Sequence, residues 1–363
     1  MIALKQIIKK VAGERISCHL YYRRHYRRLL NKLGYSRGPM KGEPDYLKQW
    51  RQLSFLVEPY SYRLYSNYCG QTPDIVPYDI LHTIIEPTLN PPSLWAEYED
   101  KNKFSEIVGS DILPCAIVSR MAGGQIKYHV ALSEIDCALI IKPSVDRSCG
   151  EGVVRFEKEG GVYRSKDGRV LDDEYMMSYG NDFVVQEALQ QHTVLERLSP
   201  TALATIRLAV YRSVGDGEPH VTAAVLRVGA KGAVVDNIVA GGRFVGVDVA
   251  TGRISTPFFA RFGEQSNIWN DVDLSCEDVF IPSWDEVVQL AHRVAKSIPH
   301  HHLLALDITV TAQKKPMLIE YNIGGFSPYL FHFTGQTIFG WWTDEVVTYT
   351  RTASFSPTAA SRS

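Results

Sequence analysis

Short runs of apolar and β-branched residues, separated by polar turns, dominate the chain from about residue 112 onward. The runs ILPCAIVSR, TIRLAVYR and LLALDITVT are examples, at residues 112–120, 205–212 and 303–311. Their length and their enrichment in Val, Ile and Leu are typical of β-strands. One segment in this part, residues 283–298, has helical spacing instead. The pattern therefore predicts an α+β body with antiparallel sheets.

The helix predicted over residues 283–298 has both a buried face and a start signal. Its apolar stripe consists of Val287, Leu290, Ala291 and Val294. Ser283, followed three residues later by Glu286, matches the pattern of a capping pair at a helix N-terminus. A further helix is expected at residues 198–204, LSPTALA.

The first 110 residues have a different pattern. Residues 2–33 predict one or two helices that end at Gly34, and residues 35–44 predict a linker. Residues 45–110 are rich in Tyr and Pro, show no βαβ alternation, and are expected to be mostly helical. At the other end of the chain, the polar segment 354–363 is expected to be disordered.

Charge divides the chain into a basic arm and an acidic remainder. The 363 residues carry a net charge of −1, yet residues 1–42 hold eleven Lys and Arg against one acid, a net of +10. The rest of the chain therefore carries a net of −11. An acidic carrier protein or an anionic membrane surface is a candidate partner for such an arm, whereas no nucleic acid is expected. The simpler alternative, which we favour, is that the arm docks on the acidic body of its own chain.

Composition bounds the class of protein. Hydrophobic residues make up 45% of the chain and charged residues 22%, so a sizeable core can form. We find no apolar run long enough to span a bilayer and no signal-peptide pattern at the N-terminus. The six cysteines are scattered without a CxxC pair, which is typical of reduced thiols. We therefore expect a cytoplasmic protein.

Three oxygen-bearing side chains lie near the end of the strand-rich region. One strand carries Asp307, and the next carries Glu320 and Asn322 on one face, because residues two apart in a strand point the same way. If the two strands form a hairpin whose turn centres on Gln313–Lys314, Asp307 lies opposite Glu320. Two carboxylates this close need a proton or a cation between them. Since Mg²⁺ prefers carboxylate and amide oxygens, the sequence predicts a Mg²⁺ site.

Cationic side chains in apolar or glycine-rich segments would complete a phosphate site beside the metal. Lys142 ends the run ALIIK and is followed by a small-residue loop with two glycines. Arg207 lies within TIRLAVYR, and Arg227 ends AVLR. The alternative for both arginines is a structural ion pair, for example with Asp236.

These segments, in this order, resemble the ATP-grasp superfamily. Glu320 follows Asp307 by thirteen residues, and Asn322 lies two residues after Glu320. This spacing is similar to the metal-binding signature of the superfamily, as found in the D-alanine–D-alanine ligases. More narrowly, DKNKF, FVVQEALQQH, TIRLAVYR and VVDNIVAGG resemble the sugar-transfer-associated ATP-grasp family, which is named for its occurrence with cell-surface polysaccharide biosynthesis. The resemblance covers roughly residues 80–345. It departs after Asn322, where IGGFSPY is unlike the D-alanine ligases, so no second-substrate pocket is carried over.

The resemblance implies an architecture of two α+β lobes that clasp ATP. The small lobe would span residues 111–187 and the large lobe residues 188–345. The basic arm and linker, residues 1–44, and the mostly helical region, residues 45–110, would precede the lobes. A tail, residues 346–363, would follow them.

The resemblance also implies a role for each matching residue. The implied ATP contacts are Lys101, Lys142, Ser148, Gly150 and Gly152 at the phosphates, and Gln186, Glu187, Ala188 and Leu189 at the adenine. The residues implied to hold the transferring phosphate and the acyl substrate are Arg207, Arg227 and Asn237. The implied ligands of Mg²⁺, with two ions expected, are Asp307, Glu320 and Asn322.

The implied activity is that of an ATP-dependent ligase. Superfamily members mostly join a carboxylate to an amine through an acyl phosphate, so we expect small-molecule carboxylate and amine substrates. The expected setting is cell-surface polysaccharide or secondary-metabolite biosynthesis. Two alternatives stay open: an ATP-grasp kinase with a hydroxyl acceptor, and a catalytically silent binding module, which the intact metal set argues against.

Several aromatic and histidine positions have simpler interpretations. His192, beside the adenine segment, is either a helix cap or a ribose contact. His300, His301 and His302 follow a proline and are expected to form a solvated turn, since adjacent residues cannot all face one ion. Trp341 and Trp342 are expected to pack against the last helix.

Overall fold

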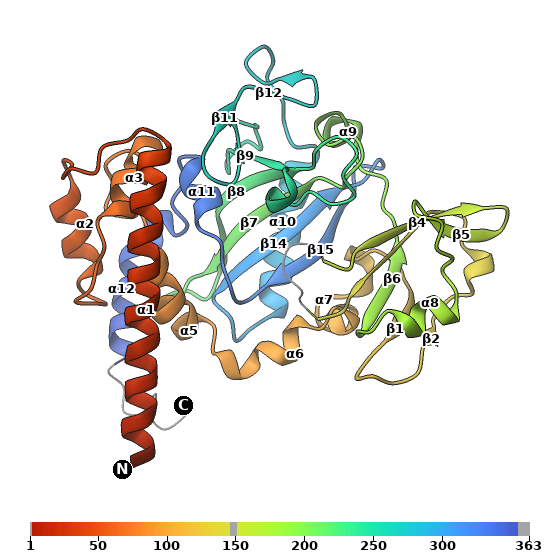
Figure 1. The fold of residues 1–363 in the computed structure, drawn as a ribbon, viewed down its shortest axis with the longest axis horizontal. Coiled ribbons are helices and arrows are strands. Elements are labelled where there is room, and N and C mark those ends of the chain that lie inside the picture. The colour runs from red at the N-terminus through yellow and green to blue at the C-terminus, as the bar shows by residue number, and fades with distance from the viewer. Residues whose placement is uncertain (1, 146–150, 355–363) are drawn as a thin grey trace.

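The computed structural model describes residues 2–145 and 151–354 of the chain. Figure 1 shows three parts along the long axis of the molecule: a group of N-terminal helices, a large central sheet, and a smaller sheet at the other end. Both sheets are antiparallel, and helices pack against the central one, which confirms the predicted α+β class. None of the helices in the described part of the chain combines the length and the apolar character needed to cross a bilayer.

Helices make up the N-terminal part, as the sequence predicted. Their bounds are α1 (Ile2–Lys32), α2 (Glu43–Trp50), α3 (Tyr60–Cys69), α4 (Tyr78–Ile80), a π-helical turn (Leu81–Ile85), α5 (Glu86–Leu89), α6 (Trp95–Glu99) and α7 (Phe104–Val108). Buried aromatic residues hold them together: Tyr26 of α1 packs edge-on against Tyr65 of α3, with ring centroids 5.7 Å apart. The Tyr-rich composition of residues 45–110 thus supplies the interior of this part.

The smaller sheet has six strands in the order β2-β1-β6-β3-β4-β5. Their bounds are β1 (Ala116–Arg120), β2 (Lys127–Tyr128), β3 (Leu139–Pro143), β4 (Val154–Glu159), β5 (Val162–Ser165) and β6 (Phe183–Glu187). Successive side chains of a strand point to opposite faces of the sheet. Leu139 and Ile141 of β3 lie in the core beneath α8 (Asp173–Ser178), together with Met176 of that helix. Ile140 and Lys142 therefore point to the opposite face.

The central sheet has seven strands in the order β11-β10-β9-β8-β7-β14-β15. Their bounds are β7 (Thr205–Arg212), β8 (Pro219–Val228), β9 (Arg243–Val247), β10 (Phe258–Phe259), β11 (Gln265–Ser266), β14 (Leu303–Val310) and β15 (Pro316–Asn322). Two short strands outside this sheet, β12 (Ile268–Trp269) and β13 (Val272–Asp273), pair with each other. The remaining helices are α9 (Thr193–Leu198), α10 (Trp284–Ser297), α11 (Tyr329–Phe333) and α12 (Thr343–Ser354).

The two faces of the central sheet are covered differently. On one face, Ile206 and Leu306 pack in one core with Val287 and other residues of α10. On the other face, Ala209 and Ala305 pack in a second core with the N-terminal helices and α11. This second core covers only part of that face, and the uncovered part, where the polar residues of β7, β8, β14 and β15 lie, holds the site described below.

Several local predictions were wrong. Ser283 does not cap α10: its φ is 51°, and its hydroxyl donates instead to the carbonyl of Lys314. The helix expected at 198–204 lies earlier, at α9, and its last residue is followed by Ser199 in a non-helical conformation before Pro200. His301 is fully buried, not solvated, because the ring of Tyr98 packs against it.

The structure also differs in part from the predictions for the C-terminal part of the chain. Trp342 stacks on His220, with ring centroids 4.2 Å apart, but Trp341 is 96% exposed. Helix α12 crosses the boundary expected at residue 345 and buries Val346 and Val347 against the N-terminal helices. The segment 354–363, expected to be disordered, lies outside the described residues apart from Ser354, which ends α12.

Candidate functional site

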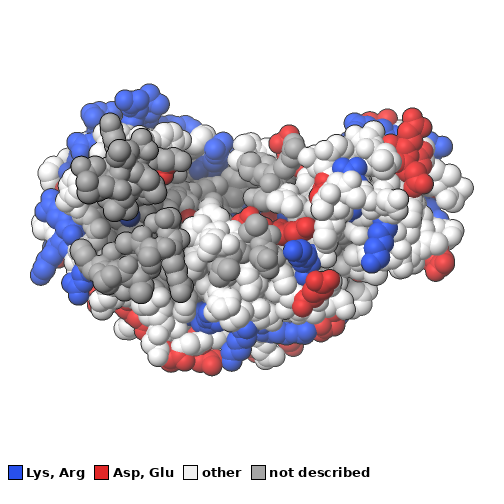
Figure 2. All heavy atoms as spheres, turned by 90° about the horizontal axis from the view of Figure 1, so that it is seen from below, with Lys and Arg blue, Asp and Glu red and all other residues white. Residues whose placement is uncertain are grey.

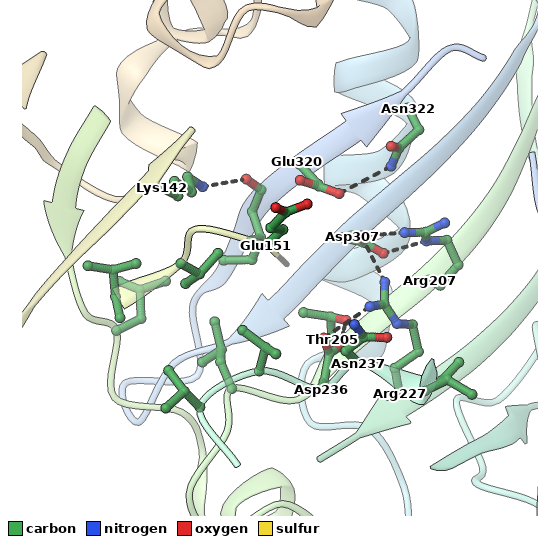
Figure 3. A pocket seen from close by; sticks show the side chains of 18 of the residues that line it. Lys142, Glu151, Thr205, Arg207, Arg227, Asp236, Asn237, Asp307, Glu320 and Asn322 are labelled. Atoms are coloured by element: carbon green, nitrogen blue, oxygen red, sulfur yellow. Dashed lines mark hydrogen bonds and ion pairs between the residues drawn. The ribbon is translucent and has the colours of Figure 1, made fainter. Parts of the chain in front are cut away.

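A cleft with a volume of about 410 Å³ lies between the two sheets. The central sheet provides its polar wall, and the outward face of β3 and the end of β6 provide the wall opposite. Figure 3 shows side chains from β7, β8, β14 and β15 pointing into it. The predicted residues that line the cleft are Lys101, Lys142, Gln186, Glu187, Ala188, Leu189, Arg207, Arg227, Asn237, Asp307, Glu320 and Asn322.

The β14–β15 hairpin has the predicted register at the site. Asp307 pairs with Glu320, and Ala305 with Asn322. Beyond Asp307 the register shifts by one residue, so that Ile308 pairs with Leu318, and a bulge separates the site from the turn. The bulge leaves Asp307 and Glu320 as neighbours across the two strands, as the sequence indicated.

Two arginines hold Asp307. Arg207, its partner across β7 and β14, donates from Nε to Oδ1 at 2.5 Å and from Nη2 to Oδ2 at 2.6 Å. Arg227 of β8 adds a bond from Nη1 to Oδ2 at 3.1 Å. Burial alone would raise the pKa of Asp307, but Arg207 and Arg227 outweigh it and hold that pKa below its ordinary value. Asp307 is therefore ionised.

Arg227 also joins a second buried carboxylate to the site. Its Nη2 donates to Oδ1 of Asp236 at 3.0 Å, and the hydroxyl of Thr205 donates to the other oxygen of Asp236. Burial raises the pKa of Asp236, and the charge of Arg227 offsets this only in part. The structural ion pair considered for Arg227 is thus present, on the same face as the cleft.

Lysines flank Glu320 on the side facing the smaller sheet. Nζ of Lys101 lies 3.6 Å from Oε2 of Glu320, and Nζ of Lys142 donates to the carbonyl of the preceding residue, Ile319, at 3.3 Å. Desolvation, and next the positive charge of Lys101, lower the pKa of Lys142 to about 8. An anionic ligand placed between these ammonium groups would relieve their mutual repulsion.

The donor set of Asp307, Glu320 and Asn322 fits a hard cation. Its atoms are two carboxylates and an amide oxygen, and the Glu320 side chain is 28% exposed toward the cleft. The amide nitrogen of Asn322 lies 3.5 Å from Oε1 of Glu320. Asp307 accepts three bonds from arginines, and its two oxygens offer about four acceptor positions. Within residues 2–145 and 151–354, no cluster of three or more His, Cys, Asp or Glu side chains offers a competing site.

The far end of the cleft is suited to a flat apolar ring. Ile140, Leu189 and Leu203 line it, next to the backbone of residues 186–189. The amide of Glu187 bonds to the carbonyl of Cys115, and the amide of Ala188 to the carbonyl of Ala138, so these bonds fix the position of the strand end. His192, the open case beside this segment, is a cap: its ring accepts from the amide of Val194 at the start of α9.

The glycine-rich loop, residues 146–152, can be described only in part. Ser148 and Gly150, expected at the phosphates, lie outside the described residues. Gly152 has a φ of +83°, which favours glycine, and its carbonyl accepts from the hydroxyl of Tyr179 at 2.5 Å. Glu151 lines the cleft beside Glu320 (Figure 3).

Sequence reasoning did not include some residues of the cleft. Thr205 and Asp236 were not among the expected site residues, although Thr205 lies two residues before Arg207 and therefore on the same face. Ser327 and Tyr329, after the metal-binding segment, line the wall next to the second core. No local pattern could find them, because a contact from the N-terminal part positions them: Glu86 accepts from the amide of Phe326 at 2.8 Å.

Asn237 lies at the edge of the cleft with part of its side chain engaged. Its carbonyl oxygen accepts from the amide of Val239 at 2.8 Å and so starts a short 3₁₀ turn, Ile238–Ala240. Gly242 follows closely, and a Cβ there would lie 2.9 Å from three backbone carbonyl oxygens. This glycine allows the segment VVDNIVAGG to fold tightly over the end of β8.

Comparison with known proteins identifies the family. A family model described as "Sugar-transfer associated ATP-grasp" matches residues 82–329, more than half of the chain. No curated protein matches the sequence. The family match confirms the ATP-grasp fold that the sequence predicted.

The solved structures that match this chain share little sequence with it. D-cycloserine synthetase DcsG is 11% identical over 73% of this chain and 73% of its own, with a TM-score of 0.41. The ADP complex of purK, N5-carboxyaminoimidazole ribonucleotide synthetase, is 14% identical over 67% of this chain, with a TM-score of 0.37. The ATP-grasp ligase PsnB with its minimal precursor is 14% identical over 72% of this chain, with a TM-score of 0.38. This chain spans 51% of the purK chain and 63% of the PsnB chain.

Proposed function

Because the chain belongs to the sugar-transfer associated ATP-grasp family, we propose that it is an ATP-dependent ligase that joins a carboxylate to an amine. One observation carries the proposal: Glu320 lies between lysines on one side and the Arg207–Asp307–Arg227 cluster on the other. Alternating cations and carboxylates along one wall suit a Mg²⁺-bound triphosphate and an anionic second substrate.

The proposed roles follow the positions of the residues. The residues that would hold ATP are Lys101 and Lys142 at the phosphates and the segment 186–189 at the adenine. Asp307, Glu320 and Asn322 would bind Mg²⁺, which neutralises phosphate charge when bound. Arg207, Arg227 and Asn237 would orient the carboxylate substrate and the transferring phosphoryl group.

The proposed reaction has two steps whose atoms balance. A carboxylate oxygen of the substrate attacks the γ-phosphorus of ATP; the bond to the β,γ-bridging oxygen breaks, and ADP leaves. The amine then attacks the acyl carbon, phosphate leaves with the bonding electron pair, and the amine loses a proton. Arg207 and Arg227 reduce the repulsion between the carboxylate and the phosphates. The reaction needs no protein nucleophile.

We include in the proposal a setting in cell-surface polysaccharide or secondary-metabolite biosynthesis; the words "sugar-transfer associated" in the family description favour the first. Ser327 and Tyr329, at the wall of the cleft nearest the N-terminal helices, would contact the amine substrate. Asp236 would hold Arg227 in place for the acyl phosphate.

The test is ADP release with Mg²⁺, ATP and a pooled set of carboxylates, with and without hydroxylamine. We expect a hydroxamate, because hydroxylamine captures an acyl phosphate. ADP without hydroxamate, together with phosphate on an organic hydroxyl, would replace the ligase by a kinase. Folded protein that neither binds nor hydrolyses ATP would leave the binding module as the better account.

Matched variants separate the site from general damage. Lys142→Ala should lower ADP release by roughly a hundredfold, as loss of one charge-stabilising donor does in other enzymes. Lys166→Ala, at an exposed lysine in the turn after β5, should leave it unchanged. Glu320→Gln should weaken the Mg²⁺ dependence of nucleotide binding, whereas Glu174→Gln, at an exposed position of α8, should not. Equal behaviour of the site and control variants would contradict the proposed site.

A further inference from the structure

Helix α1 packs against the body through one face only. His19, Tyr26, Leu29 and Leu30 are buried, and Tyr26 and the leucines join the second core. Figure 1 shows the N-terminal end of α1 extending beyond the rest of the molecule. The exposed part of the helix surface carries the arginines Arg23, Arg24, Arg27 and Arg28. We call this set the arginine face.

The arginine face has no carboxylate partners among the described residues. The ion pairs from α1 to the body are His19–Asp79 at 2.8 Å and Lys32–Glu264 at 2.5 Å. Arg23 and Arg27 lie over the ring of Tyr60, at 5.6 and 5.5 Å from its centroid, a contact that positions them without neutralising them. Helix α1 thus docks on the body of its own chain, as favoured from sequence, through its buried face and the pairs of His19 and Lys32, but the arginine face takes no part in these ion pairs.

Exposed apolar residues accompany the arginines on the same helix. Ile16, Leu20 and Tyr21 are 46%, 56% and 64% exposed. Ile16, Leu20 and Arg24 follow at intervals of four residues, and Arg27 follows three later, so they lie along one side of the helix. Apolar side chains among unpaired cations are typical of a helix that lies in a membrane interface.

The net charge of α1 also favours contact with an anionic surface. The helix holds nine Lys and Arg and a single acid, Glu14, a net of +8. Figure 2 shows Lys and Arg side chains around the end of the molecule that holds α1 and α2. At 1.5 Å per residue, its 31 residues form a rod about 46 Å long, which a flat surface can contact along its length.

We propose that α1 binds the molecule to an anionic lipid bilayer through the arginine face, with Ile16, Leu20 and Tyr21 inserted at the headgroup level. An acidic protein would be drawn by the same charges but would not require exposed apolar side chains beside them. The cleft lies away from α1, between the two sheets, so a bilayer at this end leaves it open to substrate (Figure 1).

The experiment is sedimentation of the full chain with vesicles of phosphatidylcholine that contain or lack phosphatidylserine. Binding should require phosphatidylserine and weaken at high salt. Each basic residue near such a surface contributes roughly fivefold, so Arg24→Glu with Arg28→Glu should weaken binding at least about a hundredfold. These two arginines have no contact that holds the fold in the described part of the chain. The matched control, Arg164→Glu with Lys166→Glu, makes the same charge change at the far end of the molecule and should keep binding.

Leu20→Ser and a soluble polyanion distinguish a bilayer from an acidic protein. Leu20→Ser should weaken vesicle binding roughly tenfold through lost apolar burial. Polyglutamate should bind more weakly than the vesicles. No binding to phosphatidylserine vesicles, equal loss in the control pair, or tighter binding to polyglutamate with no effect of Leu20→Ser would each overturn the proposal.

Discussion

Breaking the Arg207–Asp307 pair tests whether the cleft is held together by charge. We consider Arg207→Met, Asp307→Asn and the double variant. The pair makes two bonds of 2.5 and 2.6 Å, and its side chains are only 12% and 4% exposed. Removing one partner of a buried pair costs about 3–5 kcal/mol of stability, because the remaining charge is stranded.

The neighbouring arginine reduces the expected magnitude. Arg227 still lies 3.1 Å from Asp307 after Arg207→Met, so the carboxylate keeps one cation. We therefore expect each single variant to lose about 2–3 kcal/mol and the double variant to lose less than their sum, with a coupling energy of about 2 kcal/mol. The double variant should lose less than the sum because it leaves neither Arg207 nor Asp307 as an unpaired buried charge.

The assay is denaturant unfolding followed by tryptophan fluorescence and by far-ultraviolet circular dichroism, whose agreement justifies a free energy. The matched control is the surface pair Arg253–Asp278, bonded at 2.9 and 2.5 Å but 57% and 65% exposed. Its cycle should give a coupling energy below about 0.5 kcal/mol, since water screens exposed pairs. A coupling for Arg207–Asp307 no larger than that of the control would refute the reasoning.

Two further variants test the packing around the site. Asn90→Ala should lower the free energy of unfolding by about 3 kcal/mol, because this buried side chain makes four hydrogen bonds to backbone groups of His302, Leu303 and Ile323. A thermal midpoint within about 2 °C of wild type would contradict this. Gly252→Ala should lower the thermal midpoint more than Gly160→Ala. Both glycines have positive φ, but only at Gly252 would a Cβ lie 2.5 Å from the Trp284 ring. Equal shifts of the midpoint would show that the ring moves aside.

The sequence could predict the metal-binding hairpin because that hairpin is local. Asp307 and Glu320 are joined by a short turn, and period-two alternation then places Asn322 on the face of Glu320. Pro316, which lacks an N–H, indicated that the register could shift, but the sequence did not place the bulge after Asp307, since it depends on how β14 fits between β7 and β15. The prediction succeeded because the bulge lies on the turn side of the site.

The contacts that complete the site are long-range, and local pattern does not encode them. Glu86 reaches Phe326, and Asn90 reaches both β14 and the residue after β15, across more than two hundred residues of sequence. His301 is buried for the same reason: Tyr98 covers the turn in which it lies. Partners of this kind are set by tertiary packing, which composition and periodicity leave undetermined.

Two buried groups should give stability opposite dependences on pH. His332 is fully buried, and neither ring nitrogen has a hydrogen-bond partner among the described residues. Burial lowers its pKa from 6.5 to about 3, so the folded state resists a proton that the unfolded chain accepts. Glu58 caps α3 from a buried position, and burial raises its pKa from 4.5 to about 7, so the folded state takes up a proton earlier than the unfolded chain.

The signs follow from linkage. The stability that depends on neutral His332 is present above pH 6.5 and is lost as pH falls toward 3. The contribution of protonated Glu58 is present below pH 4.5 and is lost as pH rises through 7. Each group changes the free energy of unfolding by about 1.4 kcal/mol per pH unit within its window.

His332→Phe is the more informative of the two variants, because its effect on packing can be distinguished from its effect on titration. A change in packing shifts the stability curve by the same amount at every pH, whereas removal of the imidazole changes its slope. Between pH 6.5 and 5, His332→Phe should therefore gain about 2 kcal/mol relative to wild type, measured by denaturant unfolding. Glu58→Gln should lose the gain that wild type shows on acidification from pH 7. His300→Phe, at an exposed position, should run parallel to wild type. If His332→Phe also runs parallel, the folded protein accepts a proton at His332, and the imidazole must have a partner that offsets its burial.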